Sequence, residues 1–111
     1  MKKILVLSAV LALLACSANE VKKVSEMNFP VYGNYCGPKY PPAGSTPVPV
    51  DEVDNACKKH DGCYEENGYF NQECDRQIIA DLKMIKPKTP QEKLSRKLII
   101  AYFSEALKIQ K

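Results

Sequence analysis

Apolar residues recur with a helical period in three stretches of the chain. In the first stretch, Asp51 is a favourable N-cap, and the pattern stops at residues 65–68 (EENG). Four residues between these limits are spaced by four, three and four positions, which puts them on one face of a helix: Val53, Cys57, His60 and Tyr64. The spacing therefore predicts a helix with the only histidine of the chain on its inner face.

Two further helices follow. One runs from Gln72 to about Ile85, after the N-cap residue Asn71 and before Pro87. The other begins at a capping box, residues 89–92 (TPQE), and runs toward Ile109. The apolar face of this last helix is predicted to contain Leu94, Leu98, Ala101, Phe103 (or Tyr102) and Leu107. The chain is therefore expected to be mainly α, with little strand.

The N-terminal residues have the pattern of an export signal. Lys2 and Lys3 precede an apolar run that is too short to span a bilayer. This run ends in residues 13–16 (LLAC), which resemble the lipobox of bacterial lipoproteins; an ordinary signal peptide is the alternative. The resemblance implies a lipoprotein signal peptide at residues 1–15, an acylated Cys16 and a lipid-anchored tether at residues 16–31. Because no aspartate follows Cys16, the resemblance also implies an exported protein anchored in the outer membrane.

Charge and size restrict the function further. The formal net charge is +3, and it falls to +1 for the 96 residues left after cleavage before Cys16. No basic stripe with interleaved aromatic residues is present, so we expect no nucleic-acid partner. A domain of this size has a small core and benefits from disulfide bonds, which form after export.

Four cysteines remain for disulfides once Cys16 is assigned to lipid, and they allow three pairings. A bond between Cys57 and Cys63 is excluded because about 9 Å of helical rise would separate them. The favoured pairing joins Cys36 to Cys57 and Cys63 to Cys74. The crossed pairing, Cys36 with Cys63 and Cys57 with Cys74, stays open on spacing alone.

The candidate chemistry lies in a loop and in the first helix. Residues 32–38 (YGNYCGP) form a tight, backbone-exposing loop, which can direct several carbonyl oxygens at a hard cation. His60 and Asp61 differ by about 100° around a helix, so their side chains serve different sites. This arrangement suggests a general base beside a metal ligand.

These motifs together resemble secreted phospholipase A2. The similar stretches are residues 32–37 (YGNYCG), residues 54–64 with their CKKHDGC core, and residues 74–76 (CDR). The resemblance implies a small disulfide-stapled fold with two core antiparallel helices, a calcium-binding loop and a C-terminal helix, within a catalytic domain at residues 32–111. It also implies Ca²⁺ ligands and catalytic groups. The Ca²⁺ ligands would be the carbonyls of Tyr35, Gly37 and Lys39 and the carboxylate of Asp61. The catalytic groups would be His60 as the general base, Asp75 as the residue that orients it, Tyr64 as support for this hydrogen-bond network, and the Gly37 amide as a donor to the oxyanion.

This chain departs from the family pattern in three places. Residues 38–40 (PKY) stand where relatives continue with glycines. Ala56 replaces the first of two adjacent cysteines, and no N-terminal amphipathic helix is evident.

The expected function is calcium-dependent hydrolysis of the sn-2 ester of phospholipids in a membrane. The enzyme is expected to act as a monomer, and the sequence does not indicate a protein partner. Two alternatives are a catalytically silent member of the fold that binds a membrane or a protein, and a purely structural lipoprotein.

Overall fold

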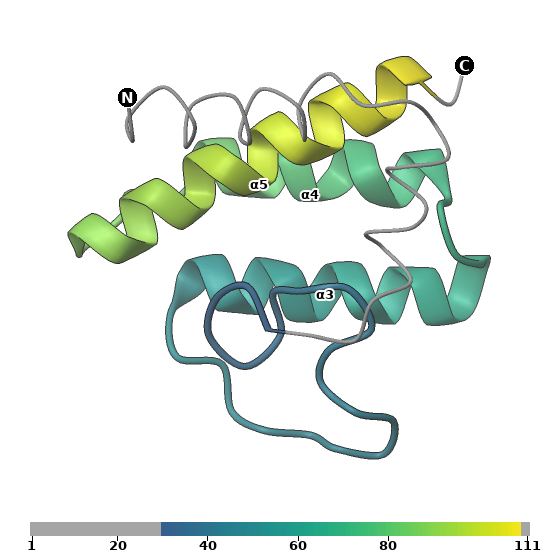
Figure 1. Cartoon of the computed structure of the whole chain (residues 1–111), viewed down its shortest axis with the longest axis horizontal. Helices are drawn as coiled ribbons and strands as arrows, with labels where there is room; N and C mark the ends of the chain where they lie inside the picture. Colours follow the sequence, from purple (N-terminus) through teal and green to yellow (C-terminus); the bar gives the residue numbers. More distant parts are fainter. Residues whose placement is uncertain (1–29, 110–111) are drawn as a thin grey trace, which may run out of the picture.

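The computed structural model describes residues 30–109, and three helices account for most of them (Figure 1). They are α3 (Glu52–Asn67), α4 (Gln72–Met84) and α5 (Pro90–Ile109). Within the described residues, β pairing is limited to an isolated bridge in the loop before α3. The prediction of a mainly helical fold is confirmed.

The N-terminal predictions lie outside the described residues. These are the signal peptide at residues 1–15, the acylation of Cys16 and nearly all of the tether at residues 16–31. Between residues 30 and 109, no helix is both long enough and apolar enough to cross a bilayer.

The predicted caps of α3 are present. The Asp51 side chain accepts the amide hydrogen of Asp54 at 2.8 Å and so satisfies one of the free donors at the start of the helix. At the other end, Gly68 has a φ of 98° and its amide donates to the carbonyl of Tyr64 at 2.8 Å. Glycine adopts this backbone conformation easily, so α3 ends where the sequence pattern breaks.

The caps of α4 and α5 also follow the prediction. The Asn71 side chain accepts the amide hydrogen of Cys74 at 3.0 Å, and Thr89 Oγ1 accepts that of Glu92 at the same distance. Glu92 completes its capping box one residue earlier than usual, because its carboxylate accepts the amide hydrogen of Lys88 at 2.6 Å. Glu92 is only 2% exposed. The connection between the two helices is therefore tied to the start of α5.

Arg96 of α5 caps the end of α4. Its Nε donates to the carbonyl of Leu82 at 2.6 Å, and its Nη2 donates to that of Lys83 at 3.3 Å. The last carbonyls of a helix lack partners inside the helix. A side chain from the following helix supplies them here, which fixes α5 against α4.

The core lies where the helices meet, with α4 packed against both α3 and α5 (Figure 1). Ile78 and Leu82 of α4 are almost fully buried, and Val53 of α3 is fully buried. The loop before α3 contributes Tyr35 and Cys36 to the same cluster. This loop is consequently part of the core and does not hang free from it.

The predicted apolar face of α5 is wrong in its first half. Leu94 is 58% exposed and Leu98 is 43% exposed, whereas Glu92, Ile99 and Ala106 are buried. The exposed leucines lie about 120° around the helix from this buried face, at 100° per residue. The buried capping box sets the rotation of α5 at its first turn, and the two leucines are thereby turned outward.

Candidate active site

The loop before α3 is folded around the carboxylate of Asp54, which is fully buried. Its Oδ1 accepts the amide hydrogen of Tyr35 at 2.8 Å, and its Oδ2 accepts those of Asn34 and Val50, both at 2.9 Å. Three donors to one carboxylate compensate for the cost of burying its charge. Asp54 therefore holds both ends of the loop onto the first turn of α3.

Gly33 makes this close approach possible. Its φ is 59°, and a Cβ atom at this position would lie 2.5 Å from the carboxyl carbon of Asp54. Any larger residue would strain the backbone and push the carboxylate away from its amide partners.

Two disulfides connect the loop and α4 to α3. Cys36 is bonded to Cys57, with 5.1 Å between their Cα atoms, and Cys63 is bonded to Cys74, with 5.7 Å. Of the two pairings left open above, the structure has this one. Cys57 precedes His60 by three residues, and Cys63 follows it by three. The loop and the start of α4 are thus fixed on either side of the histidine.

His60 and Asp75 form a buried pair across α3 and α4. His60 Nε2 lies 2.8 Å from Asp75 Oδ1, and the residues are 7% and 1% exposed. The Tyr64 hydroxyl, one turn further along α3, donates to the same Oδ1. Burial, followed by this hydrogen bond, raises the pKa of Tyr64. The tyrosine therefore stays neutral and acts as a donor.

The ring of His60 is held between two aromatic rings. Its centroid is 4.1 Å from that of Tyr64 and 4.5 Å from that of Phe103 on α5. The other oxygen of Asp75, Oδ2, is buried and has no hydrogen-bond partner within residues 30–109. The pair is therefore shielded from water on the side of α5 and oriented through a single carboxylate oxygen.

Asp61 occupies a different environment from its neighbour His60. Burial, with smaller contributions from the carboxylates of Glu65 and Asp54, raises the pKa of Asp61 to about 8. Partial burial and the charge of Asp61 also raise the pKa of Tyr69. A cation beside this carboxyl group would favour its charged form and lower the pKa again.

The predicted carbonyl ligands all lie in the loop that Asp54 and Cys36 fix. Tyr35 is 5% exposed, and its amide is one of the three that Asp54 binds. The carbonyl of Gly37 accepts the amide hydrogen of Tyr40 at 3.3 Å. Lys39 has a φ of 51°, the left-handed conformation that glycine adopts most easily, and its ammonium group lies 5.9 Å from the ring centroid of Tyr69. The chain therefore keeps a glycine-like backbone where it has lysine.

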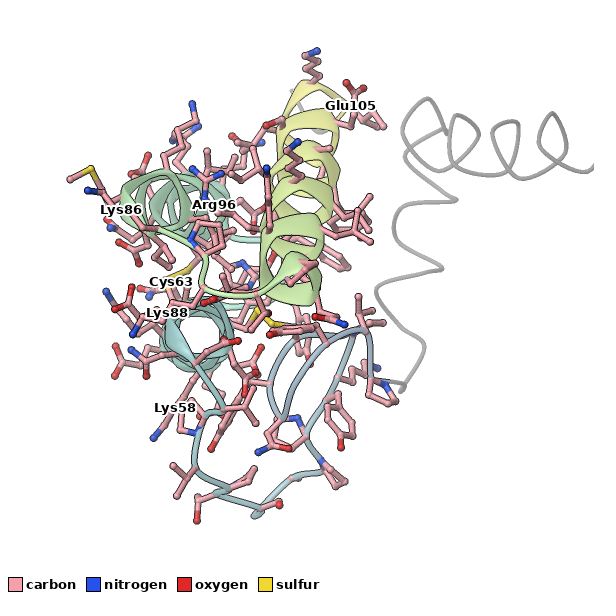
Figure 2. The ribbon with its side chains drawn as sticks, turned by 90° about the vertical axis from the view of Figure 1, so that its left-hand side faces the viewer. Lys58, Cys63, Lys86, Lys88, Arg96 and Glu105 are labelled. Atoms are coloured by element: carbon pink, nitrogen blue, oxygen red, sulfur yellow. A yellow bond between two sulfur atoms is a disulfide. The ribbon has the colours of Figure 1, made fainter. Side chains whose placement is uncertain are left out.

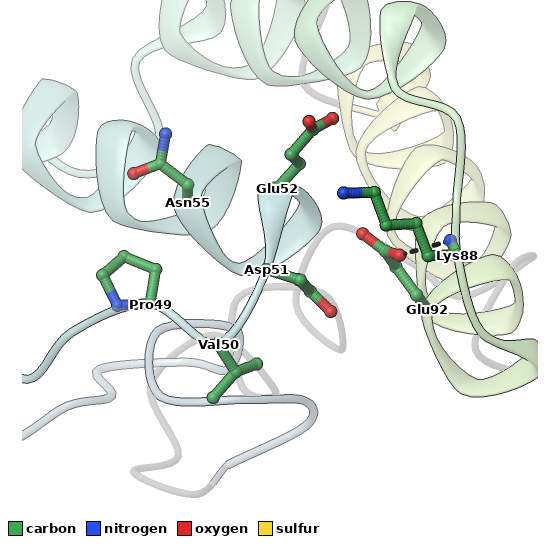
Figure 3. A pocket seen from close by; sticks show the side chains of 7 residues that line it. All are labelled: Pro49, Val50, Asp51, Glu52, Asn55, Lys88 and Glu92. Atoms are coloured by element: carbon green, nitrogen blue, oxygen red, sulfur yellow. Dashed lines mark hydrogen bonds between the residues drawn. The ribbon is translucent and has the colours of Figure 1, made fainter.

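The described residues contain no group of three or more His, Cys, Asp or Glu side chains placed to hold a metal. A hollow of about 490 Å³ is lined by the start of α3 and by Lys88 and Glu92 (Figure 3). Neither this hollow nor a smaller one between α3 and α4 is lined by His60, Asp61 or Asp75. The candidate catalytic residues therefore lie outside both hollows.

Two residues of the site were not predicted from the sequence. Asp54 is given no role beyond its place in the similar stretch at residues 54–64, and Phe103 is predicted only as part of the apolar face of α5. The signal for Asp54 was its place one turn after the N-cap Asp51, beside the glycine-containing loop. For Phe103 no local signal exists, because its partner His60 is 43 residues away.

Comparisons with known proteins identify the family of the chain. The sequence profile of the family described as Phospholipase A2 matches residues 10–98. The textilotoxin D chain of Pseudonaja textilis, named an acidic phospholipase A2 homolog, is 51% identical over 37 residues, which are 33% of this chain and 21% of that protein. An acidic phospholipase A2 of Micrurus dumerilii is 46% identical over 44 residues, which are 40% of this chain and 33% of that protein.

A third relative is the taipoxin gamma chain of Oxyuranus scutellatus scutellatus, also named an acidic phospholipase A2 homolog. It is 49% identical over 37 residues, which are 33% of this chain and 21% of that protein. The chain spans between a fifth and a third of the length of these curated relatives. No solved structure matches it. Because the family profile covers most of the sequence, the chain belongs to the phospholipase A2 family.

Proposed function

We propose that the protein hydrolyses the sn-2 ester of glycerophospholipids and releases a fatty acid and a lysophospholipid. The observation that carries this proposal is the buried contact between His60 and Asp75 in a chain of the phospholipase A2 family. A histidine beside a carboxylate is suited to accept a proton at neutral pH.

The proton is taken at Nδ1 of His60. Nε2 faces the carboxylate of Asp75 and carries the hydrogen of that bond, so Nδ1 keeps its lone pair. In the proposed step a water molecule gives its proton to Nδ1 while its oxygen attacks the ester carbon. Asp75 keeps the ring in this tautomer and stabilises its charged form. The same proton passes to the departing glycerol oxygen when the ester bond breaks.

The aromatic contacts support this role. Tyr64 donates to Asp75 and packs on His60, and Phe103 covers the ring from α5. Excluding water around a charge pair strengthens its electrostatic interaction. The tyrosine and the phenylalanine thereby favour the transient imidazolium and keep the ring in one orientation.

The types of oxygen donor that Asp61 and the loop offer suit a calcium ion. Ca²⁺ prefers carboxylate and backbone carbonyl oxygens, which Asp61 and the loop residues Tyr35, Gly37 and Lys39 would provide. Burial and two nearby carboxylates raise the pKa of Asp61 to about 8, and a bound cation would offset this effect. When bound, the ion would polarise the ester carbonyl and stabilise the oxyanion, together with the Gly37 amide.

The proposal includes export of the protein and anchoring through an acylated Cys16. The lipobox-like residues 13–16 and the two disulfides, which form in oxidising compartments, support this location. Attachment to the outer membrane is part of the proposal because bacterial lipoproteins, which the N-terminal residues resemble, are kept in the inner membrane by an aspartate after the cysteine, and Ser17 stands there instead.

The test is fatty-acid release from mixed phospholipid vesicles with Ca²⁺ or EGTA, for the purified protein and for His60→Gln. Release that requires both Ca²⁺ and His60 is expected. Thermal unfolding and calcium titration of His60→Gln provide the control that the variant is folded. If the folded, oxidised protein binds Ca²⁺ and releases no fatty acid, it is a silent binding member of the family.

A further inference from the structure

A proline-rich segment, residues 41–49 (PPAGSTPVP), connects the predicted carbonyl ligands to the start of α3. Figure 1 shows this part of the chain as an excursion that moves away from α3 and returns to it. We call residues 32–39, which contain the predicted carbonyl ligands, the ligand loop. Proline has a fixed φ and no amide hydrogen, so the segment has few backbone conformations and few donors of its own. Its carbonyl groups are therefore acceptors that lie on a stiff backbone.

Two side chains of the ligand loop donate hydrogen bonds to this segment. The hydroxyl of Tyr35 donates to the carbonyl of Pro47 at 2.6 Å, and Nδ2 of Asn34 donates to the carbonyl of Val48 at 2.7 Å. Two neighbouring residues of the loop thus bind two neighbouring residues of the segment. A pair of bonds of this kind fixes both the distance and the direction between the two backbones.

Lys58 of α3 makes a further contact with the same tyrosine. Its ammonium group lies 5.7 Å from the ring centroid of Tyr35, within the range of a cation–π interaction. Figure 2 shows Lys58 on the side of α3 that is next to the loop. The ring of Tyr35 is therefore held at its face by Lys58 and at its hydroxyl by Pro47.

Core packing does not account for these contacts. None of residues 41–49 is buried, and the side chain of Val48 is 81% exposed. The segment adds little apolar area to the core, yet it binds both Asn34 and Tyr35. Its contacts are directed at the ligand loop.

We propose that the proline-rich segment is a brace that sets the calcium affinity of the site, with Tyr35 and Asn34 as positioning residues. A backbone carbonyl ligand has no rotamer of its own, so the direction of its oxygen depends on how the whole residue is held. Asp54 holds the amide of Tyr35, and Pro47 holds the end of its side chain. The Tyr35 carbonyl belongs to a residue that is thus fixed at two points. This inference rests on the proposed function, because it takes the ligand loop as part of the calcium site.

The experiment measures Ca²⁺ binding to the purified protein by isothermal titration calorimetry, without lipid. Tyr35→Phe removes the bond to Pro47 and keeps the ring, and Asn34→Ala removes the bond to Val48 and keeps the backbone amide on Asp54. Tyr40→Phe is the matched control, because it removes a hydroxyl just after the ligand loop and leaves both contacts in place. Urea unfolding in EGTA follows the stability of each variant separately.

Both brace variants are expected to bind Ca²⁺ about tenfold more weakly, which is the lower end of the effect of groups that orient metal ligands. The control is expected to bind as the wild type does. A lower urea midpoint with an unchanged calcium affinity would make the contacts purely structural and would overturn the proposal. An equal loss of affinity in Tyr40→Phe would overturn it as well. If Tyr35→Phe does not fold, Asn34→Ala decides, because its lost bond is at an exposed site.

Fatty-acid release measured over a range of Ca²⁺ concentrations separates this inference from the proposed function. The brace variants are expected to reach the wild-type kcat at saturating Ca²⁺ and to need about tenfold more Ca²⁺ for half of that rate. If no protein releases fatty acid but the calcium affinities differ as expected, the proposed function fails and the brace stands. If release requires Ca²⁺ but both brace variants bind it as tightly as the wild type, the brace fails and the proposed function stands.

Discussion

Replacing Asp54 with asparagine tests whether a buried carboxylate organises the loop. The side chain keeps its shape, but one of its two oxygens becomes an NH₂ group that cannot accept a hydrogen bond. In the better orientation, the remaining oxygen still faces the amides of Asn34 and Val50. The new NH₂ group then faces the amide of Tyr35, donor against donor.

The expected cost follows from these three contacts. Losing one hydrogen bond to a charged group costs about 1.5–3 kcal/mol, and the two that remain become neutral and weaker. We therefore expect Asp54→Asn to lower the free energy of unfolding by about 3–5 kcal/mol. This is a large share of the stability of a small domain.

Urea denaturation followed by circular dichroism measures this loss. Asp81→Asn is the matched control, because Asp81 pairs with Lys59 at a partly exposed site, and such pairs contribute at most about 1 kcal/mol. Calcium titration is the second readout, with affinity expected to fall about 10- to 100-fold as the Tyr35 backbone loosens. A stability loss below about 1 kcal/mol would refute the role of the carboxylate. If the variant is destabilised but its calcium affinity is unchanged, Asp54 stabilises the fold and does not contribute to calcium binding.

Three further changes have defined outcomes. Phe103→Ala should destabilise the protein by about 3 kcal/mol and lower kcat, because the ring packs on His60. Phe103→Tyr should retain the stability and the kcat. Urea titrations and steady-state kinetics measure these two quantities. Arg96→Ala should cost about 2–3 kcal/mol through the two lost bonds to α4, and faster hydrogen exchange confined to the last turn of α4 would identify the cause. The pKa of Asp61 rises from 3.8 to about 8 on folding, so without calcium the folded protein holds a proton that the unfolded chain releases. The free energy of unfolding in EGTA should therefore decrease as pH rises from about 4 to 8, and a persisting slope in Asp61→Asn would contradict this assignment.

Helices and their caps were predictable because both depend on neighbours in the sequence. Asp51, Asn71 and Thr89 each bind an amide three residues ahead, so a short window contains both partners. The face of α5 was not predictable in the same way. Counting apolar residues favoured Leu94 and Leu98, but the rotation of the helix depends on a buried acid that hydrophobicity excludes from the core.

Only the site residues that belong to the family-like motif were predictable from the sequence. The sequence around His60 resembles a known family, and this resemblance supplied Asp75 as a partner. The contacts of Asp54 with Asn34 and Tyr35 cross 20 and 19 residues, and Phe103 reaches His60 across 43. Such pairings depend on how the helices pack, and one sequence does not contain this information.

The two disulfides make the assembly of the site depend on redox conditions. One bridge joins the loop to α3 three residues before His60, and the other joins the start of α4, next to Asp75, three residues after it. Each typically contributes about 2–4 kcal/mol, a substantial part of what a small domain has. In a reducing cytosol neither bridge persists. A chain that is still in a reducing cytosol therefore lacks both covalent links that hold the loop and α4 beside His60.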